Sequence, residues 1–235
     1  MRSETGAVYR RSCEYPLVSA IMPTRARPQF AREAVNLFLA QTWPNKELVI
    51  VDDEDAPSIP GPLSVAYTLN MENVNFRYER LRTKQSIGAK RNIACSRAQG
   101  EIIIHFDDDD HSAPGRMADQ VERLLSSGLE LTGYSEMLFF DGNVWRMYSG
   151  RKDYILGTSF CYRKSLWERH PFTWANIGED LAFQRGIPHT AVPAGSLMWA
   201  RTHPGNTSKR VISGPTWREA ELQTAAFLHD ERASG

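Results

Sequence analysis

One stretch decides the fold, and it runs Glu101-Ile102-Ile103-Ile104-His105-Phe106-Asp107-Asp108-Asp109-Asp110. Residues 102–106 form a short apolar run, which predicts a fully buried β-strand. Four aspartates follow that run immediately. In open parallel sheets, ligands bind beyond the carboxyl ends of the strands. The four aspartates are therefore candidate ligand-binding residues.

Strand and helix patterns alternate on both sides of this stretch. Apolar or alternating runs predict further strands at 17–22, 47–51 and 74–81. Apolar residues at helical spacing predict helices at 28–43, 86–99 and 117–125. Gly100 follows the second helix, in a position that often ends one. This alternation implies an α/β fold with a Rossmann-like, mainly parallel central sheet, right-handed crossovers and flanking helices.

The second half of the chain has a different pattern. Asp141-Gly142 separates two runs of strand character, which is a strong signal for a β-hairpin. The other predicted elements are a strand near 158–162, short helices near 164–170 and 179–185, and a final helix from 217 to about 229. We therefore expect a smaller antiparallel element in the C-terminal half.

Composition excludes some classes of protein. Lys and Arg together number 28, as do Asp and Glu, so the formal net charge is zero and no basic excess favours nucleic-acid binding. The three cysteines form no CxxC pair, which is typical of reduced thiols in a cytoplasmic protein. We find neither a signal peptide nor a run long enough to span a bilayer. Peripheral membrane contact and the oligomeric state stay open.

Clustered acids mark the ends of two predicted strands, at Asp52-Asp53 and at residues 107–110. Neighbouring carboxylates repel one another, and a divalent cation relieves that repulsion. Hard oxygen ligands suit Mg²⁺ or Mn²⁺. The alternative is a solvated acidic turn that caps the helix near Pro114. An EF-hand is disfavoured because the turn glycine and closing glutamate are missing, and a dehalogenase-like phosphatase is disfavoured by His111.

Motifs along the chain carry a resemblance to a known family. They are Pro23-Thr24-Arg25-Ala26-Arg27-Pro28, Gln41-Thr42-Trp43-Pro44-Asn45, Val49-Ile50-Val51-Asp52-Asp53, Gly88-Ala89-Lys90-Arg91-Asn92, the stretch 100–110, and Gly178-Glu179-Asp180. In this order and spacing, over residues 17–208, the set resembles family 2 glycosyltransferases. The resemblance implies a GT-A type fold and transfer of a sugar from a nucleoside diphosphate, preferably UDP, to an acceptor hydroxyl.

The resemblance also implies roles for individual residues. The residues implied to face the nucleotide are Pro23, Thr24, Arg27, Asp52, Asp53, Arg91, Asp107 and Asp108. Those implied to hold Mn²⁺ or Mg²⁺ are Asp109 and His203, and those implied near the sugar or acceptor are Gly157, Thr158 and Glu179. Asp180 is implied to be the base of an inverting reaction. We interpret 1–235 as one domain, nucleotide-binding at about 15–125 and acceptor-binding at about 126–235.

Structural alternatives stand beside several of these roles. A lone histidine such as His203 is often structural, and an acid at a helix start, such as Asp180, is usually a cap. The segment at Gly157 could equally be a plain strand start. Three tryptophans, Trp145, Trp174 and Trp199, are candidates for a sugar-stacking platform, although most tryptophans simply pack in a core or rim.

Some features depart from the family pattern. Glu54 and Asp55 stand where Gly and Ser are expected, which leaves the nucleotide base in doubt. Gln184-Arg185-Gly186 lacks the QxxRW signature of processive synthases, so a single-transfer enzyme is favoured. One rival is a sugar-phosphate nucleotidyltransferase, but residues 23–28 lack the glycines of its phosphate loop. The other is a non-catalytic nucleotide- or sugar-binding module.

Overall fold

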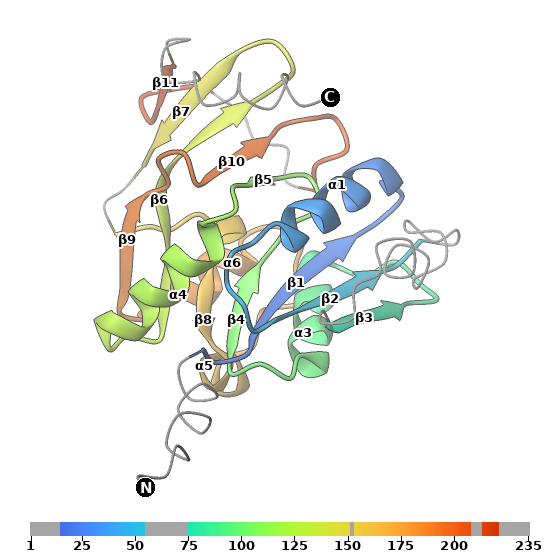
Figure 1. The fold of residues 1–235 in the computed structure, drawn as a ribbon. Helices are drawn as coiled ribbons and strands as arrows, with labels where there is room; N and C mark the ends of the chain where they lie inside the picture. Colours follow the sequence, from blue (N-terminus) through green and yellow to red (C-terminus); the bar gives the residue numbers. More distant parts are fainter. Residues whose placement is uncertain (1–14, 55–74, 151–152, 208–212, 221–235) are drawn as a thin grey trace, which may run out of the picture.

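A computed structural model describes residues 15–54, 75–150, 153–207 and 213–220 (Figure 1). One sheet runs through both halves, in the order β11-β7-β6-β8-β4-β1-β2-β3. Its strands are β1 (Val18–Thr24), β2 (Lys46–Asp52), β3 (Asn75–Arg80), β4 (Ile102–His105), β6 (Leu131–Phe140), β7 (Trp145–Ser149), β8 (Cys161–Arg163) and β11 (Trp217–Glu219). Three strands pair off this path: β5 (His111–Ser112), β9 (His189–Pro193) and β10 (Met198–Arg201).

The strand directions confirm the predicted mixture of parallel and antiparallel pairing. β1 runs parallel to β2 and β4, and β2 runs parallel to β3. β8 lies antiparallel between β4 and β6. The predicted hairpin is present as β6 and β7, and Gly142 in its turn has φ of 96°, a conformation that favours glycine.

Helices cover both faces of the sheet. α1 (Pro28–Leu39) and α4 (Arg116–Ser127) pack on one face, whereas α3 (Ile87–Arg97), α5 (Lys164–Arg169) and α6 (Glu179–Gln184) pack on the other. Side chains alternate along β1 accordingly, so Ala20 and Met22 join the core under α1 while Ile21 joins the core under α3. Both faces of β1, β2 and β4 are therefore buried, which explains their continuous apolar runs, whereas the edge strand β3 is partly exposed.

Two sequence predictions about element ends are wrong. Gly100 does not end α3, which stops at Arg97. A Cβ on Gly100 would lie 2.5 Å from the Leu17 carbonyl oxygen, so glycine is needed there for close backbone approach. The predicted final helix begins instead as strand β11, because Trp217 packs edge-on against rings of the β6–β7 hairpin. The rest of that predicted helix lies outside the described residues.

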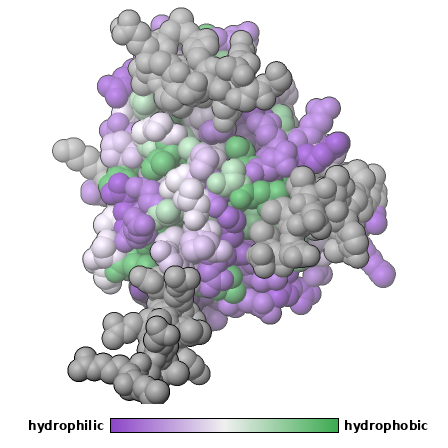
Figure 2. Space-filling view, viewed as in Figure 1, coloured by the Kyte–Doolittle hydropathy of each residue, from purple (hydrophilic) through white to green (hydrophobic). Residues whose placement is uncertain are grey.

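The strand ends bring the motifs to one edge. Thr24 at the end of β1 pairs with Asp52 at the end of β2, and Ile21 pairs with His105 immediately before the acidic stretch. The face seen in Figure 2 is mostly hydrophilic, with hydrophobic side chains scattered in small groups. Across the described ranges, none of the helices combines the length and the apolar character needed to cross a membrane.

Candidate active site

A cleft opens at the carboxyl edge of the parallel strands. Of the sequence-predicted residues, those that line it are Pro23, Arg27, Arg91, Asp107, Asp108, Asp109, Gly157, Thr158, Glu179 and Asp180. These residues come from the ends of β1 and β4, from α3, from the 3₁₀ turn at Gly157–Ser159 and from the start of α6. Residues as far apart in the sequence as Pro23 and Asp180 thus share one cleft.

Asp107 carries an unsatisfied carboxylate oxygen. Its Oδ2 accepts a hydrogen bond from Arg91 Nη2 at 3.3 Å, and Arg91 Nη1 contacts Glu179 Oε1 at 2.6 Å. Its Oδ1 is buried and has no hydrogen-bond partner among the described residues. Burial raises the pKa of Asp107, although the charge of Arg91 opposes the rise. A buried acceptor without a partner is unfavourable, so this oxygen is suited to a ligand hydroxyl or cation.

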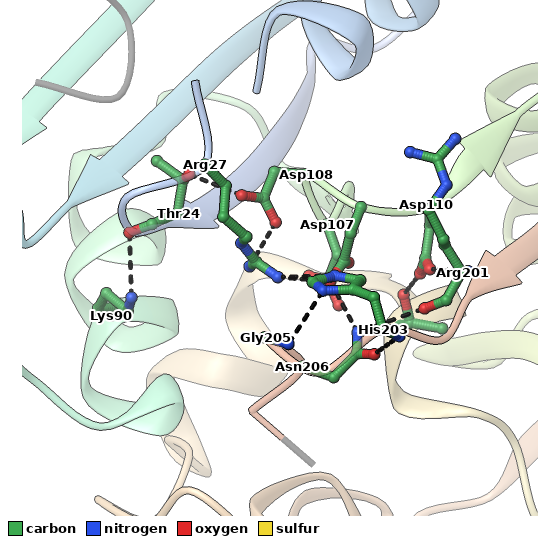
Figure 3. A network of polar contacts seen from close by, with 12 residues as sticks. Thr24, Arg27, Lys90, Asp107, Asp108, Asp110, Arg201, His203, Gly205 and Asn206 are labelled. Carbon is green, nitrogen blue, oxygen red and sulfur yellow. Dashed lines mark hydrogen bonds and ion pairs between the residues drawn. The ribbon is translucent and has the colours of Figure 1, made fainter. Parts of the chain in front are cut away.

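Arg27 neutralises the next two aspartates. Its Nη2 lies 2.6 Å from Asp108 Oδ1 (Figure 3). Its Nη1 lies 2.6 Å from Asp109 Oδ2. Thr24 also donates to Asp108, at 2.6 Å. Burial nevertheless raises the pKa of Asp108 to about 7, and charge repulsion from the neighbouring carboxylates contributes to this rise. The carboxylates at 107–110 therefore still repel one another even though the Arg27 guanidinium pairs with two of them.

Two side chains from the segment after β10 converge on Asp109. His203 Nε2 lies 3.1 Å from Asp109 Oδ2, and Asn206 Nδ2 donates to the same oxygen at 2.9 Å. Burial by itself would raise the pKa of Asp109, but the hydrogen bond from His203 and the charge of Arg27 outweigh burial and lower the pKa. Of the four aspartates at 107–110, Asp109 is therefore the one whose pKa is lowered and whose charged form is favoured.

The donor set fits a divalent cation that the substrate helps to hold. Asp109 and His203 offer an oxygen and an imidazole nitrogen 3.1 Å apart, a spacing that two ligands of one ion can adopt. The described part of the chain contains no group of three or more His, Cys, Asp or Glu side chains suited to a metal. Mg²⁺ typically binds through one or two carboxylates with substrate phosphates completing its shell, so two protein ligands are compatible with such a site.

Asp180 lies in the same cleft, next to Gly157. It is the second residue of α6, whose N-cap is Gly178, so Asp180 is not the N-cap residue. Its Oδ1 accepts from the Leu181 amide at 2.8 Å, and Tyr154 donates to its Oδ2 at 3.4 Å. A Cβ on Gly157 would lie 2.6 Å from Asp180 Oδ2, so the absence of a side chain at Gly157 makes room for this carboxylate.

The structure does not bring Asp52 and Asp53 into the cleft. Asp52 accepts from the Tyr78 hydroxyl at 2.6 Å and from the Glu54 amide at 3.2 Å. Asp53 accepts from Lys90 Nζ at 3.0 Å and from the Gln85 amide at 2.6 Å. Both carboxylates are buried in these contacts. Their implied contact with a nucleotide base therefore stays a prediction, and Asp55 lies outside the described residues.

Sequence reasoning missed several polar groups of the site. Asn206 contacts Asp109, although its sequence context suggests only an Asn-x-Ser glycosylation site. Lys90 anchors Asp53 and also donates to the Thr24 carbonyl at 3.1 Å. Asp110 is among the acids that the sequence predicts, but its contacts are not predicted: it accepts from the Thr158 hydroxyl and, at 3.4 Å, from the Arg201 amide. The Gly-Ala-Lys-Arg-Asn motif could have identified Lys90, whereas nothing local to Asn206 pointed to Asp109.

The three candidate tryptophans have different environments. Trp145 packs against Trp199 and Phe140, and Trp199 also stacks on His111. These two rings belong to the packed aromatic cluster of β6, β7 and β10. Trp174 is 79% exposed, on the loop that leads to α6. Of the other predicted features, the thiols of Cys95 and Cys161 are free and buried, and Cys13 lies outside the described residues.

Comparisons with known proteins add to this geometry. A family model described as glycosyl transferase family 2 matches residues 19–201. An uncharacterized glycosyltransferase of Haemophilus influenzae is 28% identical over 178 residues, covering 72% of this chain and 70% of that protein. A candidate colanic acid biosynthesis glycosyl transferase of Escherichia coli K12 is 35% identical over 103 residues. That match covers 44% of this chain, which spans only 36% of the E. coli protein.

Solved structures share the fold. TarS of S. aureus in complex with UDP superposes with a TM-score of 0.61 at 20% identity, over 80% of this chain and 61% of that chain. The mannosyltransferase PcManGT of Pyrobaculum calidifontis, in complex with GDP-Man and Mn²⁺, superposes with a TM-score of 0.62 at 16% identity. The match covers 82% of this chain and 59% of PcManGT. At these identities the likeness concerns the fold alone.

Proposed function

Because the chain belongs to glycosyl transferase family 2 and has the GT-A type α/β fold, we propose that it transfers a sugar from a nucleoside diphosphate to an acceptor hydroxyl. One observation carries the proposal. A single cleft holds an acid cluster with an unpartnered carboxylate oxygen and, separately, the Asp180 carboxylate. The first suits a phosphate-bound cation or a ribose, and the second suits an acceptor hydroxyl.

The donor side of the cleft is assigned to the first half of the chain, at about 15–125. Pro23, Thr24 and Asp52, or its neighbour Asp53, are proposed to face the base. Arg91 is proposed to face the nucleotide and Asp107 the ribose, and Asp108 is proposed to share the task of Asp107 or that of Asp109. Asp109 and His203 are proposed to hold Mn²⁺ or Mg²⁺, which when bound would stabilise negative charge on the departing diphosphate. The Arg27 guanidinium pairs with Asp108 and Asp109, so when a cation binds it must move away or contact Asp109 together with the cation.

The acceptor side is assigned to the second half, at about 126–235. Asp180 is proposed to take the proton of the acceptor hydroxyl while that oxygen bonds to the anomeric carbon. The bond from that carbon to the diphosphate breaks on the opposite side, so the anomeric configuration inverts. Glu179 is less suited to be the base because its carboxylate pairs with Arg91 at 2.6 Å. Gly157 and Thr158 line the cleft beside Asp180, where the sugar would lie.

A ligand panel tests this function. We expect one nucleoside diphosphate, with UDP as first candidate and GDP as second, to raise the melting temperature in the presence of Mn²⁺. At one hundred times Kd, a ligand specific for the native state adds about 2.7 kcal/mol to the free energy of unfolding. The matching sugar nucleotide should be hydrolysed or transferred. Binding without turnover of any sugar nucleotide would favour the non-catalytic module, and pyrophosphate release from a nucleoside triphosphate would favour the nucleotidyltransferase.

Substituting Gly157 with Ala should impair catalysis by moving Asp180. The new methyl group would meet Asp180 at 2.5 Å from its Cβ, and a displacement of about 1 Å in a reacting group can reduce a rate about a hundredfold. We expect turnover to fall by about that factor while the shift in melting temperature caused by the nucleoside diphosphate remains.

A glycine with room for a side chain provides the control. A Cβ on Gly115 would meet only Leu197 Cδ2, at 3.5 Å, so Gly115→Ala should leave turnover close to that of the wild type. Turnover of Gly157→Ala equal to that of Gly115→Ala would show that the position of Asp180 does not limit the reaction.

A further inference from the structure

Exposed apolar side chains gather on the segment that carries Asp180. Among the described residues, five large hydrophobic side chains are exposed, and three of them are Trp174, Ile177 and Leu181. Their exposed fractions are 79%, 78% and 51%. We call these three residues the apolar rim. A surface tryptophan and isoleucine this exposed in one short segment typically mark a binding surface.

The backbone that presents the apolar rim is firmly held. The Gly88 amide donates to the Ala175 carbonyl at 3.1 Å, and the Ile87 amide donates to Asn176 Oδ1 at 3.0 Å. A Cβ on Gly88 would lie 1.9 Å from the Thr173 carbonyl oxygen, so the loop lies directly against the start of α3. Binding to a surface that is already ordered loses little conformational entropy, which favours recognition.

Packing below the loop adds to this support. Asn92 bonds both backbone groups of Phe172, as donor at 2.8 Å and as acceptor at 3.0 Å. The Phe172 ring stacks on Phe183 of α6 with centroids 4.1 Å apart. The loop and α6 are thus joined through the core, so Trp174 and Asp180 are held by the same packed unit.

The apolar rim is continuous with the cleft. Ile177 lines the cleft together with Asp180, and Leu181 directly follows Asp180 in α6. On the proposed function, the molecule whose hydroxyl reaches Asp180 must lie along this rim. The rim therefore belongs to the acceptor side and not to the nucleotide side, whose residues come from β1, β4 and α3.

The charges carried by the rim segment itself favour one chemistry for that molecule, beside the Arg91 guanidinium that pairs with Glu179. From Trp174 to Leu181 there is no Lys or Arg, and the two charged residues are Glu179 and Asp180. Surfaces that bind anionic lipid typically carry clustered basic residues, so this segment is unsuited to a phospholipid headgroup. A neutral pyranose fits better, because its C–H face packs on an indole ring while its hydroxyls reach carboxylates and amides.

We infer that the acceptor is a neutral pyranoside whose C–H face packs on Trp174 and Ile177 while one hydroxyl reaches Asp180. This inference rests on the proposed function and names the substrate class of its acceptor side. Trp174 would bind substrate without taking part in proton transfer. Its loss should therefore weaken acceptor binding and leave the reaction of the donor with water intact.

The test compares two reactions of the same purified protein. With the donor identified by the ligand panel, hydrolysis is measured without acceptor and transfer is measured with a panel of methyl and aryl pyranosides. We expect Trp174→Ala to raise KM for the best pyranoside about tenfold, with donor hydrolysis within about twofold of wild type. Trp174→Tyr should restore most of the affinity, and Leu125→Ala, at an exposed leucine on α4, should have no effect.

Each remaining outcome has a defined meaning. Absence of both hydrolysis and transfer in the wild type would overturn the proposed function itself. Donor hydrolysis without transfer to any pyranoside, or an unchanged KM in Trp174→Ala, would overturn the pyranoside inference alone. Flotation of the wild type, but not of Trp174→Ala, with phosphatidylglycerol vesicles would identify the rim as a membrane contact and would also overturn the inference.

Discussion

Substitution of Asp180 by Asn should lower transfer turnover by about a thousandfold, within the range attributed to general acid–base catalysis. Asn has the same shape but cannot accept the proton of the acceptor hydroxyl. Asp180 is not the N-cap of α6, and no basic side chain pairs with it among the described contacts. Its carboxylate is therefore available to a substrate. Turnover is measured at saturating donor, and nucleotide binding is measured by thermal shift.

The control separates a catalytic role from a helix-start role. Asp119 is an acid in the first turn of α4 and pairs with Arg123 at 2.8 Å, outside the cleft. We expect Asp119→Asn to change stability slightly and turnover very little. Nucleotide binding should survive in Asp180→Asn. Turnover equal to that of Asp119→Asn would remove Asp180 from the mechanism and would favour the non-catalytic module.

Substitution of Asp109 by Asn should weaken binding of the catalytic cation and lower turnover. Asp109 Oδ2 lies within 3.1 Å of side-chain nitrogens of Arg27, His203 and Asn206, so three polar groups of the site contact this one oxygen. Removing its charge should weaken cation binding and lower turnover by about a hundredfold or more, since a bound cation contributes several kcal/mol and each factor of ten corresponds to about 1.4 kcal/mol.

Rates measured over a series of Mn²⁺ concentrations check this prediction. The variant should need much more Mn²⁺ for half-maximal rate, and Asp119→Asn should need the wild-type amount. If Asp109→Asn and the wild type reach the same rate at the same Mn²⁺ concentration, Asp109 is not a ligand of the catalytic cation. His203→Gln then tests whether the histidine has a ligand role without the carboxylate.

The sequence predicts the fold well where a local pattern has one outcome. Ile102, Ile103 and Ile104 form a buried strand because parallel strands are covered on both faces, and Asp141-Gly142 forms a turn because glycine tolerates the required φ. Prediction from the sequence fails where packing against residues distant in the chain decides the secondary structure. Trp217 starts a strand because rings of the β6–β7 hairpin cover it, which no pattern around residue 217 reveals.

In the site too, local patterns are predictive and contacts between distant residues are not. The acids after β4 were predictable because strand ends of a parallel sheet meet at one edge. Arg27, which the resemblance implies to face a nucleotide, lines the cleft and also pairs with Asp109, 82 residues away in the chain. Asp52 is turned toward Tyr78 of the neighbouring strand. Such pairings depend on side-chain directions in the folded protein, which local sequence does not specify.

The central claim is that a cation held by Asp109 fixes the diphosphate of the donor. Crystals grown with Mn²⁺ and the nucleoside diphosphate of highest thermal shift test it most directly. We expect an anomalous peak within coordination distance of Asp109 and of a phosphate oxygen, with Arg27 moved away from at least one of its two aspartates. A well-ordered nucleotide with no anomalous peak, and Arg27 still bridging Asp108 and Asp109, would contradict the claim.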